Sequence, residues 1–332
     1  MLGGMETKRS LTLWPSLALV TLCALLIGIP LAFDGFMLHP LWIARASLPA
    51  FCLAIGAGLL VRLAIHRFQT RRWPAFSRRE WLAEAARLAS ALLTLMVLLG
   101  VYCWGKLLIP WFRSGVTFDH QLDAIERVLH FGIDPDLALL TALSGAAWLD
   151  RVIDLVYSQY PLVLMSIVGW FLTERDLDER HRWLRGFVLV WLGGLALYWL
   201  VPTLGPAFVF PDLAPILSKR YPIAFMTQNL LLENYVNLRG ILDGSVALPL
   251  RIEYGIAAFP SLHVAVPAHA WLFASERKHP LSGPLLIVTL VFIIGSVATG
   301  WHYLIDAWGG LALATLCWLA FRKPRAAKAL PR

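Results

Sequence analysis

The sequence predicts an all-α integral membrane protein, a polytopic bundle of eight transmembrane helices. Two observations support this. First, 58% of the 332 residues are hydrophobic and only 15% are charged. Second, the apolar residues form blocks of roughly 20 instead of amphipathic stripes, the length that crosses a hydrocarbon layer about 30 Å thick. A soluble globular class is therefore excluded.

Each apolar block is read as one span. The spans lie at 11–33, 41–64, 82–110, 155–173, 185–203, 259–275, 281–300 and 303–321. The first is too long for the hydrophobic region of a signal peptide and lacks a persuasive cleavage site, so we expect a retained anchor. This divides the chain into two N-terminal spans with a basic loop (1–81), a six-helix region (82–321) and a basic tail (322–332).

The net charge of +8 is concentrated in short segments between the blocks. With eight spans these all fall on one side, which indicates a cytoplasmic side in the plasma (inner) membrane and excludes a nucleic-acid partner. They are Lys8, Arg9 and the segments 66–80, 175–185, 276–279 and 322–328. Both termini are then cytoplasmic, and residues 34–40, 111–154, 204–258 and the joint near 301 face outward.

Two of the outward segments are long enough to cap the bundle. Residues 118–136 carry an apolar stripe of helical period, which predicts a helix lying in the membrane interface. The stripe comprises Leu122, Ile125, Val128 and Leu129, opposite Asp123, Glu126 and Arg127. Residues 204–258 contain five prolines, which predict an irregular cap or a mobile lid.

The four cysteines all lie inside apolar blocks, without a CxxC pair. Free thiols are therefore expected, with no disulfide framework and no zinc site. No cofactor is indicated.

Polar residues at span edges are costly and therefore mark candidate sites. The segment FPSLHVA (259–265) places His263 one turn into the sixth span, and TGWHYLIDAWGG (299–310) places His302 and Asp306 at the start of the eighth. The i, i+4 spacing puts His302 and Asp306 on one helix face. Two crossings separate His263 from His302, so both reach the same leaflet.

These residue types suit attack on phosphorus. An aspartate beside His302 can accept the Nδ1 proton and leave Nε2 as a nucleophile, while a protonated His263 donates to the leaving oxygen. Ser261 adds a hydroxyl at a helix N-terminus, which favours anions. Two other interpretations stay open: histidines satisfied by loop carbonyls, or a metal bound by His263, His302 and Asp306. His269 lies deeper in the bilayer.

The same motifs resemble the type 2 phosphatidic acid phosphatase superfamily. Pro260-Ser261-Leu262-His263 is similar to its Pro-Ser-Gly-His motif, and His302 with Asp306 to its His-x3-Asp motif. The variants look more like the branch containing inositol phosphorylceramide synthase. The resemblance implies a six-helix core and a metal-independent reaction, with His302 as nucleophile, His263 as general acid and Asp306 as the orienting carboxylate.

Two departures from the family concern the phosphate-binding cations. Gly295 and Ser296 stand where the family has Ser-Arg, and residues 201–208 carry no cation where a Lys-x6-Arg-Pro motif belongs. The substitutes predicted in the long outer segment are Lys219, Arg220, Arg239 and, first of all, Arg251. Lys106 and Arg113 have the Lys-x6-Arg spacing but lie two spans early, which favours a chance match.

The leading hypothesis is thus an enzyme that transfers a phosphoryl or phospho-headgroup unit at the outer face. Its partners would be phospholipid, ceramide-like or prenyl phosphate substrates. If the protein is an enzyme, the alternative reaction is hydrolysis of a lipid phosphate. The non-enzymatic alternatives are a lipid transporter with a proton relay and a purely structural protein. The oligomeric state is left open.

We expect the Arg251→Ala substitution to lower turnover much more than binding of a neutral lipid acceptor, because a cation assists only the charged phosphoryl group. Rate and acceptor binding are measured on the same preparation. Equal turnover in wild type and variant would remove Arg251 from the site.

Overall fold

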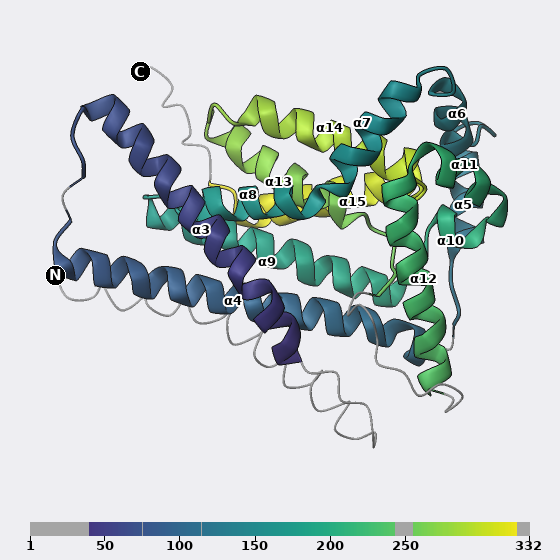
Figure 1. Ribbon diagram of the computed structural model, residues 1–332, viewed down its shortest axis with the longest axis horizontal. Coiled ribbons are helices and arrows are strands. Elements are labelled where there is room, and N and C mark those ends of the chain that lie inside the picture. The colour runs from purple at the N-terminus through teal and green to yellow at the C-terminus, as the bar shows by residue number, and fades with distance from the viewer. Residues whose placement is uncertain (1–39, 75, 114, 243–254, 324–332) are drawn as a thin grey trace, which may run out of the picture.

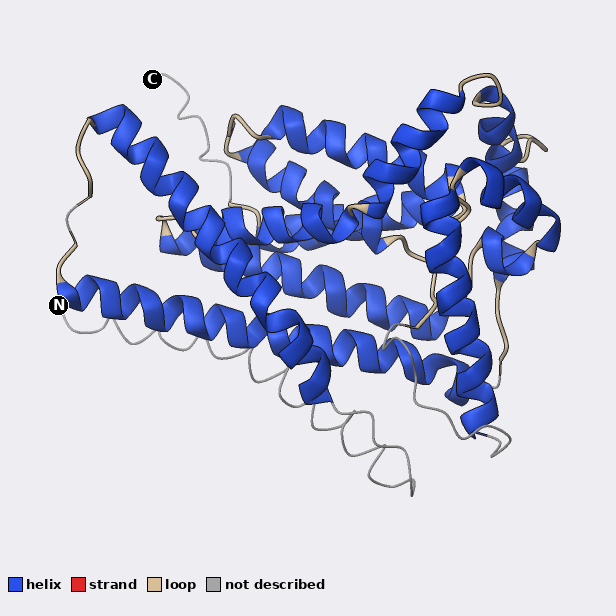
Figure 2. Cartoon of the chain, in the orientation of Figure 1, coloured by secondary structure: helices blue, strands red, loops and turns tan. Residues whose placement is uncertain are grey.

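The computed structural model describes residues 40–74, 76–113, 115–242 and 255–323. These ranges consist of helices joined by loops, without a strand (Figure 2), which confirms the predicted all-α bundle. The first predicted span, Arg251 and the basic tail beyond Lys323 lie outside the described residues.

The seven remaining predicted spans all coincide with helices. Four helices of the described chain are long and apolar enough to cross a membrane, or five if one bent pair counts as a span. The four are α3 (Pro40–Thr70), α4 (Arg78–Phe112), α9 (Leu177–Leu200) and α15 (Leu304–Phe321). The helices α13 (Leu262–Glu276) and α14 (Ser282–Ala298) are shorter than a usual span. Among the described residues, four or five helices therefore meet the length of a full span, where the sequence predicts seven spans.

One predicted span, 155–173, is broken. The structure has α7 (Ala147–Ser158) and α8 (Tyr160–Leu172), bent by 49° about Gln159. The cause is Pro161 in the first turn of α8, since proline has no N–H to donate and its ring clashes with the preceding turn. The bend directs the end of α7 toward the N-terminus of α13.

Helix α13 lies at the centre of the bundle, against α9, α14 and α15 (Figure 1). Helix α3 crosses α4 and packs on α8. This last crossing is close because two glycines face each other: a β-carbon at Gly58 would lie 2.2 Å from the carbonyl oxygen of Gly169.

The two long segments predicted to face outward are helical over most of their described residues. Residues 111–154 form α5 (Asp119–Leu129), α6 (Pro135–Ala142) and the start of α7. Residues 204–242 form α10 (Pro206–Val209), a 3-10 turn (Pro211–Leu213), α11 (Ala214–Arg220) and α12 (Pro222–Leu242). The prediction of an irregular segment was wrong for this part, because its prolines occupy the first turns of helices, where no N–H is needed.

The orientation of α5 also differs from the expectation in part. Leu122 is buried together with Asp119 and Glu126, whereas Ile125 and Val128 are exposed. The helix therefore presents apolar side chains outward, as an interfacial helix does, but its inner face carries two carboxylates instead of an apolar stripe.

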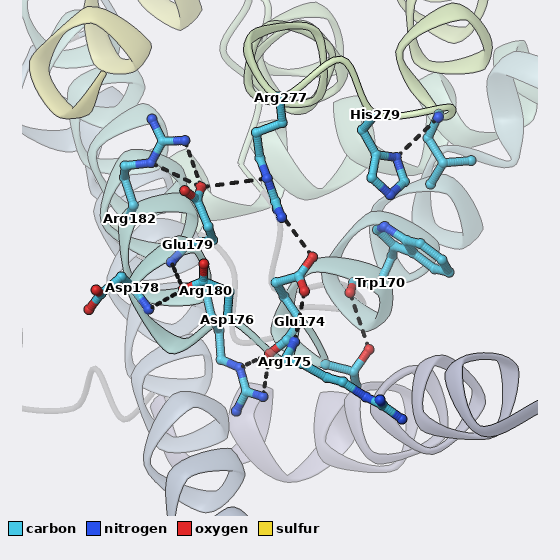
Figure 3. A network of polar contacts seen from close by, with 12 residues as sticks. Trp170, Glu174, Arg175, Asp176, Asp178, Glu179, Arg180, Arg182, Arg277 and His279 are labelled. Carbon is cyan, nitrogen blue, oxygen red and sulfur yellow. Dashed lines mark hydrogen bonds and ion pairs between the residues drawn. The ribbon is translucent and has the colours of Figure 1, made fainter. Parts of the chain in front are cut away.

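A network of ion pairs closes the end of the bundle opposite the N-terminus of α13 (Figure 3). Arg182 bonds Glu179 at 2.6 Å and Glu276 at 2.7 Å, and Arg277 bonds Glu174 at 3.1 Å. Because these groups come from α9, α13 and the loop after α8, the network ties three elements together.

All four basic segments of the sequence meet at this end. Arg175 contacts His66 of α3 at 3.3 Å, Arg277 follows α13, and Lys323 after α15 pairs with Glu179. These basic side chains lower the pKa of a partly buried acid. Burial alone would raise the pKa of Glu174, but Arg62 and Arg277 hold that pKa below its ordinary value. The basic segments thus form ion pairs that connect the helices, in addition to giving this end its positive charge.

We expect Gly58→Ala to lower the thermal unfolding temperature, because the added methyl group must push α3 away from α8, at a cost of about 1–3 kcal/mol. Gly56→Ala is the matched control on the same helix, since a β-carbon there meets nothing within 4 Å. That control should be neutral or slightly stabilising. Equal losses in both variants would contradict the α3–α8 packing.

Candidate active site

The site begins with the close approach of α13 to α15. A β-carbon at Gly310 would lie 2.4 Å from the carbonyl oxygen of Ser261, so only glycine permits this contact. The Ser261 N–H donates to the Asp306 carbonyl oxygen at 2.9 Å, which fixes the two helix starts to each other. The two sequence motifs are therefore joined through their backbones.

His302 is held by two contacts just before the start of α15. Its N–H donates to the Ser296 carbonyl at 3.1 Å. Its Nδ1 lies 3.3 Å from Asp306 Oδ2, which also accepts the Tyr303 N–H at 3.0 Å. Asp306 is fully buried and His302 is 2% exposed, so the carboxylate orients the ring in a dry environment.

His263 completes a row of three groups. Its Nδ1 lies 3.1 Å from His302 Nε2. Because His302 uses Nδ1–H to donate to Asp306, its Nε2 carries the lone pair and accepts from His263 Nδ1–H. The prediction that the histidines can meet is thus matched by direct contact.

Aromatic rings line the other sides of His263. Tyr160 stands edge-on at 4.4 Å between ring centroids, Tyr157 lies at 5.4 Å and Trp301 at 6.3 Å. Both tyrosines come from the two sides of the α7–α8 bend, so the break in that span builds the wall. The Tyr160 hydroxyl also donates to the Leu262 carbonyl at 3.3 Å.

Leu262, which stands where the resembling motif has glycine, packs against α9. Its side chain is 3% exposed and lies against Gly194 of α9, where a β-carbon would come within 2.6 Å of it. The larger residue in the motif is therefore compensated by a missing side chain on the facing helix.

Two carboxylates of α5 anchor the start of α15, and sequence reasoning missed this role. Glu126 Oε1 accepts the Ile305 N–H at 2.7 Å. Asp119 accepts the Tyr303 hydroxyl at 3.2 Å and the N–H groups of Leu204 and Gly205. The sequence feature that could have predicted this role is the i, i+7 spacing of the two acids, which places them on one helix face.

Several buried polar atoms at the site have no hydrogen-bond partner. They are Ser261 Oγ, Asp306 Oδ1 and the Tyr157 hydroxyl. Buried groups are normally satisfied, so unsatisfied ones gathered at one place indicate a bound polar ligand or water.

The metal interpretation finds no support in the geometry. His302 turns one nitrogen to Asp306 and the other to His263, so the three side chains form a row and do not converge on a point. No group of three or more His, Cys, Asp or Glu among the described residues could hold a metal ion. His269 is buried against Gly186, apart from these groups.

The predicted phosphate-binding cations are dispersed. Arg220 makes a bidentate ion pair with Asp150 at 2.7 and 2.8 Å and donates to the Leu140 carbonyl, so its charge is used inside the cap. Lys219 is exposed on α11, and Arg239 lies in the last turn of α12. Ser296 is buried behind His302 and donates to the Ile293 carbonyl.

Fold and site together define a polytopic all-α membrane protein with a histidine pair at one end of the bundle. A family model described as PAP2 superfamily matches residues 120–320, and the chain belongs to that superfamily. Its members are phosphatases and phosphotransferases, so the chain is an enzyme of that general, lipid-related type. No curated protein and no solved structure matches the chain.

The Glu126 anchor predicts a pH dependence of stability. Burial raises the pKa of Glu126 to about 7, although the Ile305 N–H opposes the shift. Because this pKa is raised in the folded state, the stability it contributes is present below about pH 4.5 and is lost as the pH rises through 7. Glu126→Gln keeps an acceptor for Ile305 without the charge.

We therefore expect the wild type to lose thermal stability relative to Glu126→Gln between pH 5 and 8. Unfolding temperatures of both proteins across this range measure the difference. Parallel curves would show that the Glu126 carboxyl does not titrate in the range.

Proposed function

We propose that the protein is a membrane-embedded lipid phosphotransferase that works through a phosphohistidine intermediate. The observation that carries this is the 3.1 Å contact between His263 Nδ1 and His302 Nε2, with Asp306 on the far side of His302. Nucleophile, proton donor and orienting carboxylate are thereby present in a single row.

In the first half-reaction the phosphorus of a donor lipid enters between the two histidines and replaces their mutual hydrogen bond. The Nε2 lone pair of His302 forms the N–P bond as the bond from phosphorus to the leaving oxygen breaks. Protonated His263 gives its proton to that oxygen and releases an alcohol. Asp306 stabilises the positive charge that develops on the His302 ring.

In the second half-reaction an acceptor hydroxyl attacks the phosphorus. Neutral His263 takes the hydroxyl proton, the N–P bond breaks, and its electron pair returns to His302 Nε2. Water as acceptor gives hydrolysis, so a lipid phosphate phosphatase (acting on phosphatidate or prenyl diphosphate) is the second candidate. The aromatic rings around His263 favour transfer, because an apolar wall disfavours the binding of water.

The substrates proposed are membrane lipids, with a phospholipid or prenyl phosphate donor and a ceramide-like or other hydroxyl acceptor, as in the branch that includes inositol phosphorylceramide synthase. We place the site at the outer face of the plasma (inner) membrane, with cytoplasmic termini. The separation of the basic end from the histidine end supports this orientation. A transporter is the remote alternative.

The mechanism predicts different effects for the two histidines. His302→Ala should abolish turnover of every substrate and formation of a labelled phosphoenzyme. His263→Gln should lower turnover of lipid esters by about 10²–10⁴, because an alkoxide needs a proton. It should lower turnover of p-nitrophenyl phosphate much less, because p-nitrophenolate leaves unprotonated.

The assay contains EDTA, with labelled phosphatidic acid, prenyl diphosphate, or phosphatidylinositol plus ceramide. His279→Ala, at the opposite end of α13, is the matched control and should behave as wild type. A label that moves to ceramide identifies transfer, and a label that moves to water identifies hydrolysis. Turnover lost on chelation, or retained in His302→Ala, would exclude the histidine mechanism.

A further inference from the structure

The site as described leaves one requirement unmet, a positive charge for the phosphoryl group. Transfer at phosphorus depends on electrostatic stabilisation of its nonbridging oxygens. Ser296 stands in place of the family's arginine, Arg220 is paired with Asp150, and Lys219 is exposed on the cap. Another cation close to the histidines must therefore be sought.

Lys106 of α4 is a cation inside the bundle without a counter-charge. Its ammonium lies 5.6 Å from the ring centroid of Tyr102 and 5.3 Å from that of Tyr198. Within the described ranges it has neither an ion pair nor a hydrogen bond. An unpaired charge inside a membrane bundle is costly, and cation–π contacts return only part of the cost. Such residues commonly serve ligands.

Backbone packing places Lys106 beside the first site motif. Gly255, four residues before Phe259, lies directly on Lys106, since a β-carbon there would be 2.8 Å from the Lys106 carbonyl group. The indole of Trp199 on α9 donates to the Gly105 carbonyl at 3.0 Å, which fixes this turn of α4. Tyr198, under the ammonium, is in hydrogen-bonding reach of the Leu262 backbone.

The charge of Lys106 also affects the pKa of His302, the proposed nucleophile. His302 lies between α14 and α15, and burial lowers its pKa while the ammonium of Lys106 lowers it further. A positive charge that acts on the ring of His302 would also attract an anion bound beside that ring.

We propose that Lys106 binds a nonbridging oxygen of the substrate phosphate, in place of the family's missing cations, and that the preferred donor is a phosphodiester. The inference rests on the proposed function. One ammonium balances the single charge of a diester, whereas a monoester brings up to two charges into the same buried place. The cation comes from α4, which precedes the matched region 120–320.

The test uses the full chain in lipid nanodiscs, with Lys106→Met to remove the charge and Lys106→Arg to keep it. Lys278→Met, at the opposite end of α13, is the control. Binding of short-chain phosphatidylinositol (a diester) and short-chain phosphatidic acid (a monoester) is measured in a His302→Ala background, where no turnover occurs. Initial rates are measured with His302 present.

We expect Lys106→Met to weaken diester binding by about tenfold to a hundredfold, as for a lost charge-assisted hydrogen bond. Lys106→Arg should restore most of it. Because the ammonium is unpaired without substrate, Lys106→Met should unfold at the wild-type temperature or above. A merely structural lysine would lower that temperature in both variants.

Unchanged binding in Lys106→Met would overturn the assignment, and so would failure of Lys106→Arg to rescue. Tighter binding or faster turnover of the monoester by the wild type would overturn the diester preference. Turnover that survives His302→Ala would instead refute the phosphohistidine reaction. The binding result in the inert background would still decide the role of Lys106.

Discussion

Helices α13 and α15 approach each other at Gly310, where no side chain separates the backbones. The hydrogen bond from the Ser261 N–H to the Asp306 carbonyl is possible only at this distance. It sets the relative height of the two helix starts and so the separation of His263 from His302. The wall of tyrosines and the α5 anchors are arranged around this contact.

Polar groups are distributed unevenly along the bundle, and the two ends differ in how their polar groups are paired. At the basic end the four glutamates that tie α4, α9 and α13 together, Glu84, Glu174, Glu179 and Glu276, are each paired with an arginine. At the histidine end several buried polar atoms are unsatisfied, and a lysine is unpaired nearby. Satisfied networks stabilise a fold, whereas unsatisfied groups leave interactions for a ligand. The ion pairs that tie the helices together and the candidate histidine site thus lie at opposite ends of α13.

Much of the fold could be predicted because apolar blocks of membrane length are a strong signal. The helix positions followed from it, and so did the convergence of the basic segments. The bend at Gln159 was not predicted, although Pro161 was visible, because a proline in a span can kink it or be accommodated. The cap helices within 204–242 were missed because proline was taken as a breaker, whereas here it lies in the first turn of each helix.

By itself, the sequence determined the helical class and the two motifs, and it led to the chemistry proposed for His263, His302 and Asp306, because these depend on residue type and local spacing. Only the tertiary structure decided which distant groups serve them. Glu126 and Asp119 anchor α15, Gly194 accommodates Leu262, and Lys106 arrives from a helix that sequence order places two spans away. Such partners are fixed by how helices pack across the bundle, and no spacing along the chain records that.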